Sequence, residues 1–73
     1  MGHEQIREAL RILRMKQLTS LTGLGRSTLY LKISQGEFPK PIQLGSPFCV
    51  GWLAHEVDAW IAKQVAQRDR HVA

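Results

Sequence analysis

The chain has 73 residues, of which 44% are hydrophobic, and a formal net charge of +4. This length allows one small domain that buries about 60% of the surface of its unfolded chain, and it disfavours an enzyme with a supported catalytic cleft. No apolar run approaches the roughly 20 residues of a membrane span. The single cysteine, Cys49, cannot form an internal disulfide, and no signal segment opens the chain. We therefore expect a cytoplasmic bacterial protein that needs no cofactor and no membrane.

The positive charge is placed unevenly along the chain. Residues 11–40 hold six basic side chains against Glu37 alone, whereas residues 41–60 hold only acidic charges. Nucleic-acid-binding proteins concentrate positive charge on one face, but a mildly basic solvated surface gives the same count. Charge alone therefore leaves both interpretations open.

The first half predicts two short helices joined by a tight turn. Apolar spacing predicts a helix from Lys16 to Thr22, where Gly23 stops it, and a second helix over 26–35 that ends at Gly36. A link of about three residues is typical of a helix-turn-helix. Before the first helix, a short strand is expected at residues 12–13.

The second half predicts a hairpin followed by a longer helix. Pro39 and Pro41 favour extended chain, and residues 42–52 show two apolar runs separated by a Gly-Ser-Pro turn, which is typical of a β-hairpin. From Ala54 onward, apolar residues recur at helical spacing as far as Val65.

These elements predict an α+β, mainly α, fold: a small winged helix-turn-helix with a β-hairpin wing and a C-terminal helix. The expected divisions are a tail or frayed helix at 1–10, a winged helix-turn-helix DNA-binding domain at 11–66, and a C-terminal tail at 67–73.

Four segments add a more specific pattern. They are Arg14-Met15-Lys16-Gln17-Leu18 with Leu21-Thr22-Gly23-Leu24, Arg26-Ser27-Thr28-Leu29-Tyr30, Gly36-Glu37-Phe38-Pro39-Lys40-Pro41-Ile42, and Val50-Gly51-Trp52 followed by His55-Glu56-Val57-Asp58-Ala59-Trp60. In this order, over about residues 11–62, they resemble the AlpA-type phage transcriptional regulators, small relatives of the MerR-like and excisionase winged helices.

The resemblance implies regulation of a prophage or integrated element, through activation of an integrase gene, through an excisionase role that bends DNA, or through both. Family members usually carry an arginine shortly before the Val-Gly-Trp run. This chain has Phe48 there and one additional residue in the wing turn. The departure removes the side chain from which a wing contact to phosphate is expected.

In a helix-turn-helix, the second helix enters the major groove with its N-terminal residues leading. Residues 26–35 are therefore the predicted reading helix, and the wing at 42–52 is expected on the adjacent groove or the backbone. Basic side chains neutralise phosphates, whereas polar side chains read base edges. The candidate DNA contacts are Lys16, Arg26, Ser27, Thr28, Tyr30, Leu31, Lys32, Gln35, Lys40, Gln43 and Ser46.

Several candidates also have a purely structural interpretation. Leu31, an apolar residue on a small and polar helix face, either packs against another part of the chain or contacts a thymine methyl group. Tyr30 is either core or a phosphate contact, and Arg26 either covers the core or binds phosphate. Gln43 and Ser46 are equally well explained as ordinary hairpin surface.

Other chemistry-bearing residues are assigned to the fold. Phe38, Trp52 and Trp60 are predicted core rather than stacking platforms for single strands, and Cys49 is a predicted small core residue. The cysteine and the histidines lack paired-ligand spacing, so no metal site is expected. Glu56 and Asp58 lie two apart on a helix and do not face each other, as a paired acid–base site requires.

The sequence thus predicts a sequence-specific regulator that binds double-stranded DNA and joins the nucleoid when bound. Self-association or tandem binding on DNA and contact with an integrase are possible additions. The alternative is a protein-interaction module on a winged-helix scaffold, in which the Leu31 face binds an integrase or a polymerase subunit.

Overall fold

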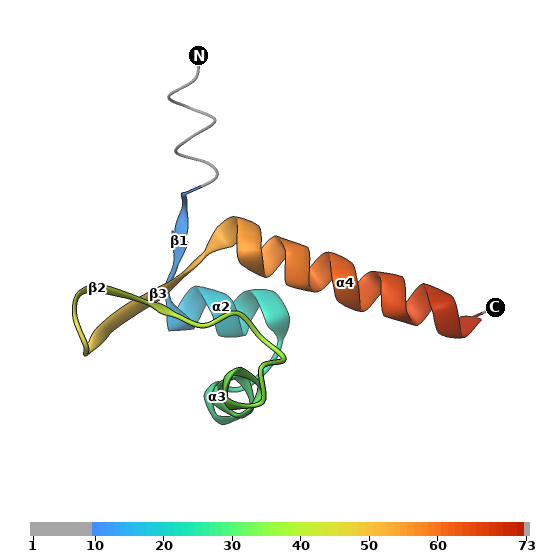
Figure 1. Ribbon diagram of the computed structural model, residues 1–73, viewed down its shortest axis with the longest axis horizontal. Helices are drawn as coiled ribbons and strands as arrows, with labels where there is room; N and C mark the ends of the chain where they lie inside the picture. Colours follow the sequence, from blue (N-terminus) through green and yellow to red (C-terminus); the bar gives the residue numbers. More distant parts are fainter. Residues whose placement is uncertain (1–9, 73) are drawn as a thin grey trace, which may run out of the picture.

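The computed structural model describes residues 10–72, which form three helices and three short strands (Figure 1). The elements are β1 (Ile12–Leu13), α2 (Met15–Thr22), α3 (Arg26–Ser34), β2 (Ile42–Ser46), β3 (Cys49–Leu53) and α4 (Ala54–Val72). This order confirms the predicted α+β, mainly helical class and the small winged helix-turn-helix. The tail or frayed helix predicted for residues 1–10 lies, apart from Leu10, outside the described residues.

The first two helices both end at glycines. Gly23 has a φ of 74°, and its N–H donates to the carbonyl of Thr19 at 2.9 Å. Gly36 has a φ of 73°, and the next residue, Glu37, donates its N–H to the carbonyl of Lys32 at 2.8 Å. Only glycine adopts a positive φ without strain, so these positions stop the helices where the sequence predicts.

The strands form one antiparallel sheet in the order β1–β3–β2, with β3 in the centre. Leu13 of β1 pairs with Trp52, and Ile42 of β2 pairs with Gly51. The β2–β3 hairpin is the wing. Figure 1 shows that it extends from the body on the side opposite to the free end of α4.

The wing turn lies further along the chain than predicted. The Gly-Ser-Pro turn was expected at residues 45–47, but β2 continues through Ser46, which pairs with Cys49. Gly45 takes a positive φ of 85° inside the strand, where the register of the hairpin is irregular. The glycine therefore bends the strand, and Pro47 and Phe48 make the turn.

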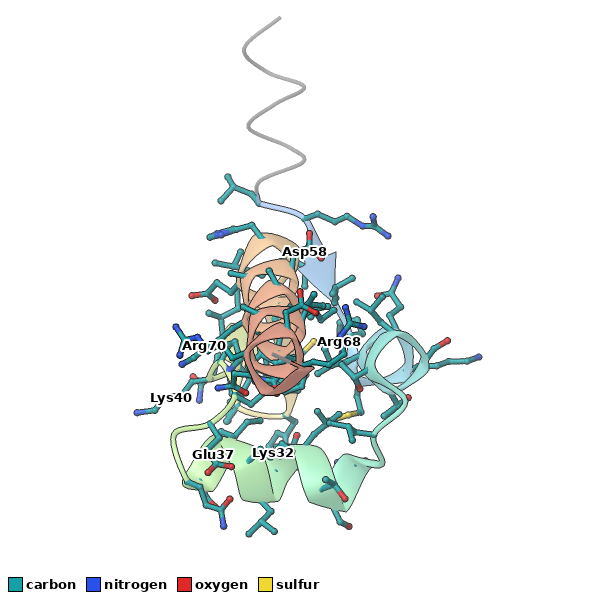
Figure 2. The ribbon with its side chains drawn as sticks, turned by 90° about the vertical axis from the view of Figure 1, so that its right-hand side faces the viewer. Lys32, Glu37, Lys40, Asp58, Arg68 and Arg70 are labelled. Carbon is teal, nitrogen blue, oxygen red and sulfur yellow. The ribbon has the colours of Figure 1, made fainter. Side chains whose placement is uncertain are left out.

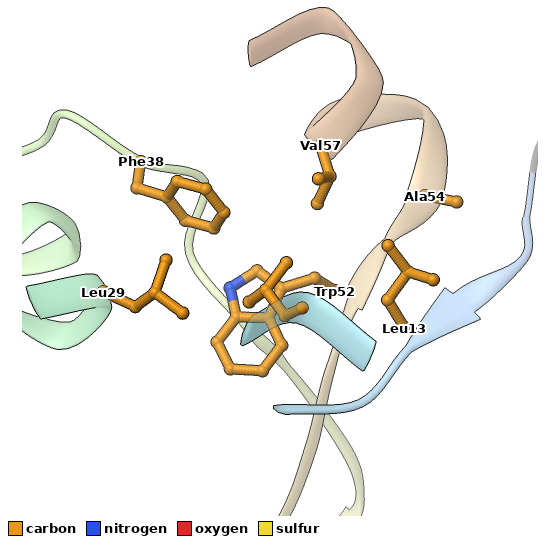
Figure 3. Close-up of a cluster of buried hydrophobic side chains, with 7 residues drawn as sticks. Leu13, Leu29, Phe38, Trp52, Ala54 and Val57 are labelled. Carbon is orange, nitrogen blue, oxygen red and sulfur yellow. The ribbon is translucent and has the colours of Figure 1, made fainter. Parts of the chain in front are cut away.

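The core lies where α2, α3 and the first turns of α4 meet the sheet (Figure 3). Its fully buried side chains are Leu18, Leu29, Trp52 and Val57. Leu13, Phe38 and Ala54 complete the buried cluster, and Trp60 packs against its edge. The aromatic core is confirmed for Phe38 and Trp52, whereas Trp60 and Cys49 are only half-buried.

Two indole rings fix the loop that follows α3. The Trp52 N–H donates to the carbonyl of Pro39 at 3.0 Å, and the Trp60 N–H donates to the carbonyl of Glu37 at 2.7 Å. Between these two bonds, Phe38 packs edge-on against Trp60 with ring centroids 4.9 Å apart. The loop is thereby attached to both the sheet and α4.

The C-terminal helix continues past the predicted domain boundary at residue 66. α4 extends to Val72, in agreement with the sequence pattern that places Arg68 and Arg70 near the end of this helix. Side chains 62–70 are all exposed, and Figure 1 shows this half of the helix projecting from the body. Alanine, glutamine, lysine and arginine dominate this stretch and favour helix without packing. The division of the chain into a domain and a C-terminal tail stays a prediction.

Candidate nucleic-acid interface

The outward side of α3 is a free surface. Leu29 is fully buried and Ile33 packs against the core, so the opposite side of the helix faces solvent. We call this side the α3 ridge; its residues, all exposed, are Ser27, Thr28, Leu31, Ser34 and Gln35. Figure 2 shows α3 at the edge of the molecule with side chains pointing away from α4. The described chain therefore leaves the predicted reading face uncovered.

The N-terminus of α3 has unpaired backbone donors. The first helical hydrogen bond of α3 runs from the N–H of Leu29 to the carbonyl of Gly25 at 3.0 Å, so the N–H groups of Arg26, Ser27 and Thr28 have no partner within the helix. Gly25 occupies the N-cap and has no side chain to cap them. Such an end, with its positive dipole, suits a phosphate group.

Arg26 and Tyr30 lie together at one edge of the ridge. The guanidinium carbon of Arg26 is 5.7 Å from the centroid of the Tyr30 ring, a cation–π distance. Tyr30 is 38% exposed, and its ring lies 6.5 Å from that of buried Trp52. Tyr30 thus joins the core on one side and solvent on the other, and Arg26 is held at the surface beside the open helix end.

Lys32 does not lie on the ridge. Its ammonium group is 4.0 Å from a carboxylate oxygen of Glu37, and its side chain is 33% exposed. Figure 2 shows the two residues between α3 and α4, where they line a hollow together with Trp60 and Lys63. An ion pair of this length near the surface contributes little stability. Lys32 is therefore a cation of α3 that flanks the ridge.

Two other predicted phosphate contacts stand apart from the ridge. Lys16 lines a groove between β1, α2 and α4 together with Arg11 and Asp58, and this groove contains no residue of α3. Lys40 is exposed on the loop after α3 and extends sideways in Figure 2. Arg26 thus lies beside the N-terminus of the helix and Lys32 flanks the ridge next to Thr28 and Gln35, whereas Lys16 and Lys40 lie on other elements.

The wing carries polar and apolar groups but no charge. Gln43 is exposed on β2, and the Ser46 hydroxyl accepts a hydrogen bond from the N–H of Phe48 at 3.1 Å. That bond fixes the turn at whose tip the Phe48 side chain is 95% exposed. Residues 41–53 include no ionisable acid or base other than the Cys49 thiol. The wing therefore offers no cation to a phosphate.

Sequence reasoning missed the exposure of Phe48. The signal was the position of an apolar residue directly after Pro47, at the midpoint of a hairpin.

Within residues 10–72, no three His, Cys, Asp or Glu side chains gather into a metal-binding group. In that same part of the chain, no helix is both long enough and apolar enough to span a bilayer.

Comparison with known proteins identifies the family. The model of the family described as prophage CP4-57 regulatory protein (AlpA) matches residues 11–65, which is most of the chain. This chain belongs to the AlpA family. The matched AlpA segment begins just before β1, includes the helix-turn-helix and the wing, and ends within α4.

Two relatives show how far the similarity extends. An uncharacterized protein, ORF88 of Enterobacteria phage P4, is 47% identical over 60 residues, which cover 82% of this chain and 67% of that protein. The DNA-binding transcriptional activator AlpA of Escherichia coli K12 is 34% identical over 64 residues, covering 80% of this chain and 90% of that protein. No solved structure matches the chain.

Proposed function

We propose that this AlpA-family chain is a sequence-specific regulator that binds double-stranded DNA and acts on a prophage or integrated element. The observation that carries the proposal is the free α3 ridge, a row of small polar side chains beside an open helix N-terminus and Arg26. Family membership supports it, since one relative is named a DNA-binding transcriptional activator. The protein acts by binding, without a catalytic step.

In this proposal, α3 lies in the major groove with its N-terminal turn leading. The free N–H groups and Arg26 contact phosphate, Ser27, Thr28 and Gln35 face base edges, and Tyr30 adds a phosphate contact from the edge of the ridge. Glutamine pairs with adenine through two hydrogen bonds, which makes Gln35 the strongest candidate for base selection. The more distant candidates are Lys16, Lys32, Lys40, Gln43 and Ser46.

The test is a mobility-shift titration on duplexes from the element's own promoter, repeated at several salt concentrations. A DNA-binding protein loses affinity steeply as salt rises, and Arg26→Ala should weaken binding to all sequences and reduce the logarithmic salt slope by about 1. Arg68→Ala is the matched control, because it removes the same charge from the exposed part of α4. Equal effects of the two variants would contradict a role for the N-terminus of α3.

Base selection has its own readout. Gln35→Ala and Thr28→Ala should lower the preference for the selected site over unrelated DNA by about 1–3 kcal/mol while leaving non-specific binding unchanged. Uniform loss on all sequences would assign these residues to the backbone instead.

The finer proposals concern what binding achieves. An activator of integrase expression binds a short pair of half-sites, whereas an excisionase needs several copies side by side, since one module covers only about 600–1,000 Å². Footprinting on the promoter and on the attachment sites separates these roles by the length of protected DNA. Self-association along DNA and contact with an integrase belong to the second role.

A second candidate function follows from the wing. An uncharged hairpin with Phe48 at its tip resembles a protein-contact site more than a phosphate contact. In this alternative, the chain docks on an integrase or a polymerase subunit through the wing. Phe48→Ser would then abolish that contact, and the mobility-shift titration would show no salt-dependent duplex binding.

A further inference from the structure

We propose that Leu31 recognises the 5-methyl group of a thymine in the major groove. The inference rests on the proposed function and deepens it by naming one base that the protein selects and the side chain that selects it. It starts from the exposure of Leu31, which is 56% although leucine is an apolar residue.

Within residues 10–72, Leu31 lies outside the hydrophobic core and outside the set of residues packed against it. The buried side of α3 is supplied by Leu29 and Ile33, and Leu31 lies on the other side of the helix. The sequence left two interpretations of Leu31 open, packing against another part of the chain and contact with a thymine methyl group. The described residues do not bury Leu31, which favours the second. Leu10 and Leu21 are exposed to a similar extent, so exposure alone does not single out Leu31. What distinguishes Leu31 is its place on the predicted reading helix, where its side chain is available to DNA.

The surroundings of Leu31 are polar and small. Its neighbours on the ridge, three and four residues away in either direction, are Ser27, Thr28, Ser34 and Gln35, all exposed. The Ser34 hydroxyl already donates to the carbonyl of Leu31 at 2.6 Å, so its proton is used within the helix. Long side chains on a helix lean toward its N-terminus, which directs Leu31 over the turn that leads into the groove.

The chemistry of the groove then selects the base. In the major groove, guanine presents two acceptors, adenine presents an acceptor and a donor, and cytosine presents its amino donor beside a bare C5–H, whereas thymine presents an acceptor beside a C5 methyl group. A leucine against a donor or acceptor leaves that polar group desolvated without a partner, which is unfavourable. A leucine against the thymine methyl group buries apolar surface of both the protein and the base. Leu31 therefore favours thymine over the other three bases.

The experiment isolates the methyl group. A high-affinity duplex is selected from random DNA, and each of its thymines is replaced in turn by deoxyuridine, which keeps the base pair and the phosphates and removes only the methyl. One methyl group in apolar contact corresponds to about a fourfold change in affinity. We expect one replacement in each bound half-site to weaken binding by about that factor.

The variant Leu31→Ala assigns the effect to its side chain. It should bind the thymine and the deoxyuridine duplexes equally, because the apolar contact is gone. Ser34→Ala is the control on the same ridge and should retain the fourfold difference. Since Leu31 is exposed, Leu31→Ala should unfold at the same urea concentration as the parent chain, which excludes loss of folding as the cause.

The outcomes separate the inference from the function on which it rests. If the parent chain binds the selected duplex and no replacement by deoxyuridine matters, Leu31 does not read thymine, although DNA binding stands. If the difference persists in Leu31→Ala, another side chain reads the methyl group and the assignment to Leu31 is wrong. If selection enriches no duplex at all, the proposed function itself fails.

Discussion

Gly51 lies in the central strand β3, at a point where the sheet leaves no room for a side chain. A Cβ at this position would lie 2.5 Å from Cγ2 of Ile12, 3.2 Å from the carbonyl oxygen of Leu13 and 3.2 Å from Cδ1 of Leu44. Non-bonded carbon atoms attract at about 3.5–4.0 Å, so a methyl group here is forced into its neighbours. We predict that Gly51→Ala destabilises the fold.

The size of the effect follows from two opposing contributions. Overpacking a well-packed site costs about 1–3 kcal/mol, and Ile12 in particular must leave its rotamer at a cost of about 0.5–1.5 kcal/mol. Replacing glycine by alanine returns about 0.4–1 kcal/mol by restricting the unfolded chain. We therefore expect Gly51→Ala to lower the free energy of unfolding by about 1–2 kcal/mol. In a domain of this size, each kcal/mol lowers Tm by about 4–8 °C.

Urea unfolding followed by circular dichroism measures this loss. In an Ile12→Ala background, which lacks the Cγ2 methyl, Gly51→Ala should cost about 1 kcal/mol less, because the closest contact is absent. Gly25→Ala is the comparison without steric overlap: its φ is −72° and nothing lies within 4 Å of the added Cβ, so its cost is limited to the lower N-cap preference of alanine. A neutral Gly51→Ala, or an equal cost in both backgrounds, would refute the steric reasoning.

Three further predictions concern the loop after α3 and the exposed end of α4. Trp60→Phe should lower the free energy of unfolding by about 1 kcal/mol, because the hydrogen bond to the Glu37 carbonyl is lost. Trp52→Phe should lower it further, because the Trp52 side chain is fully buried. A higher urea midpoint for Trp52→Phe than for Trp60→Phe would contradict this. Glu37→Gln should change the free energy of unfolding by less than about 0.5 kcal/mol, because its ion pair with Lys32 is 4.0 Å long and exposed, and a larger loss would show a stronger pair. Truncation after Gln67 should leave Tm nearly unchanged while helical ellipticity falls, since the removed side chains through Arg70 are exposed; a large drop in Tm would mean that the end of α4 packs on the domain.

The elements that the sequence predicted correctly are those with a local physical signal. Gly23 and Gly36 stop helices because they alone tolerate the required φ, and Leu29 and Trp52 mark the faces that a small domain must bury. These signals placed the helix-turn-helix, the hairpin and the start of α4. They also placed the polar face of α3, since the residues opposite Leu29 have to face solvent.

The errors arise where local signals report something other than structure. Apolar spacing measures burial, so it reports α4 only as far as Val65, and the exposed remainder of the helix to Val72 is indicated by the basic residues near its end instead. A Gly-Ser-Pro sequence favours a turn, but Gly45 serves as a bend inside β2 and the turn falls after Ser46. The role of Gly45 depends on its backbone conformation, which is set by the pairing of β2 with β3.

The candidate site was predictable in its face but not in its charges. A helical wheel places Lys32 beside the outward side of α3, yet the loop after the helix brings Glu37 to within 4.0 Å of its ammonium group. Lys16 is likewise drawn into a groove with Asp58, a residue 42 positions later in the chain. The Lys32–Glu37 pair depends on the path of the loop after the helix, and the place of Lys16 near Asp58 depends on a contact distant in sequence. Helical periodicity encodes neither.

The double attachment of the loop after α3 has a mechanical consequence. One indole ties Pro39 to the sheet and the other ties Glu37 to α4, so the helix and the wing on either side of this loop cannot swing independently. The protein then presents α3 and the wing at a fixed distance and angle from each other. A duplex that contacts both elements has to bend or twist to fit them, and sequences that deform at low cost will bind best.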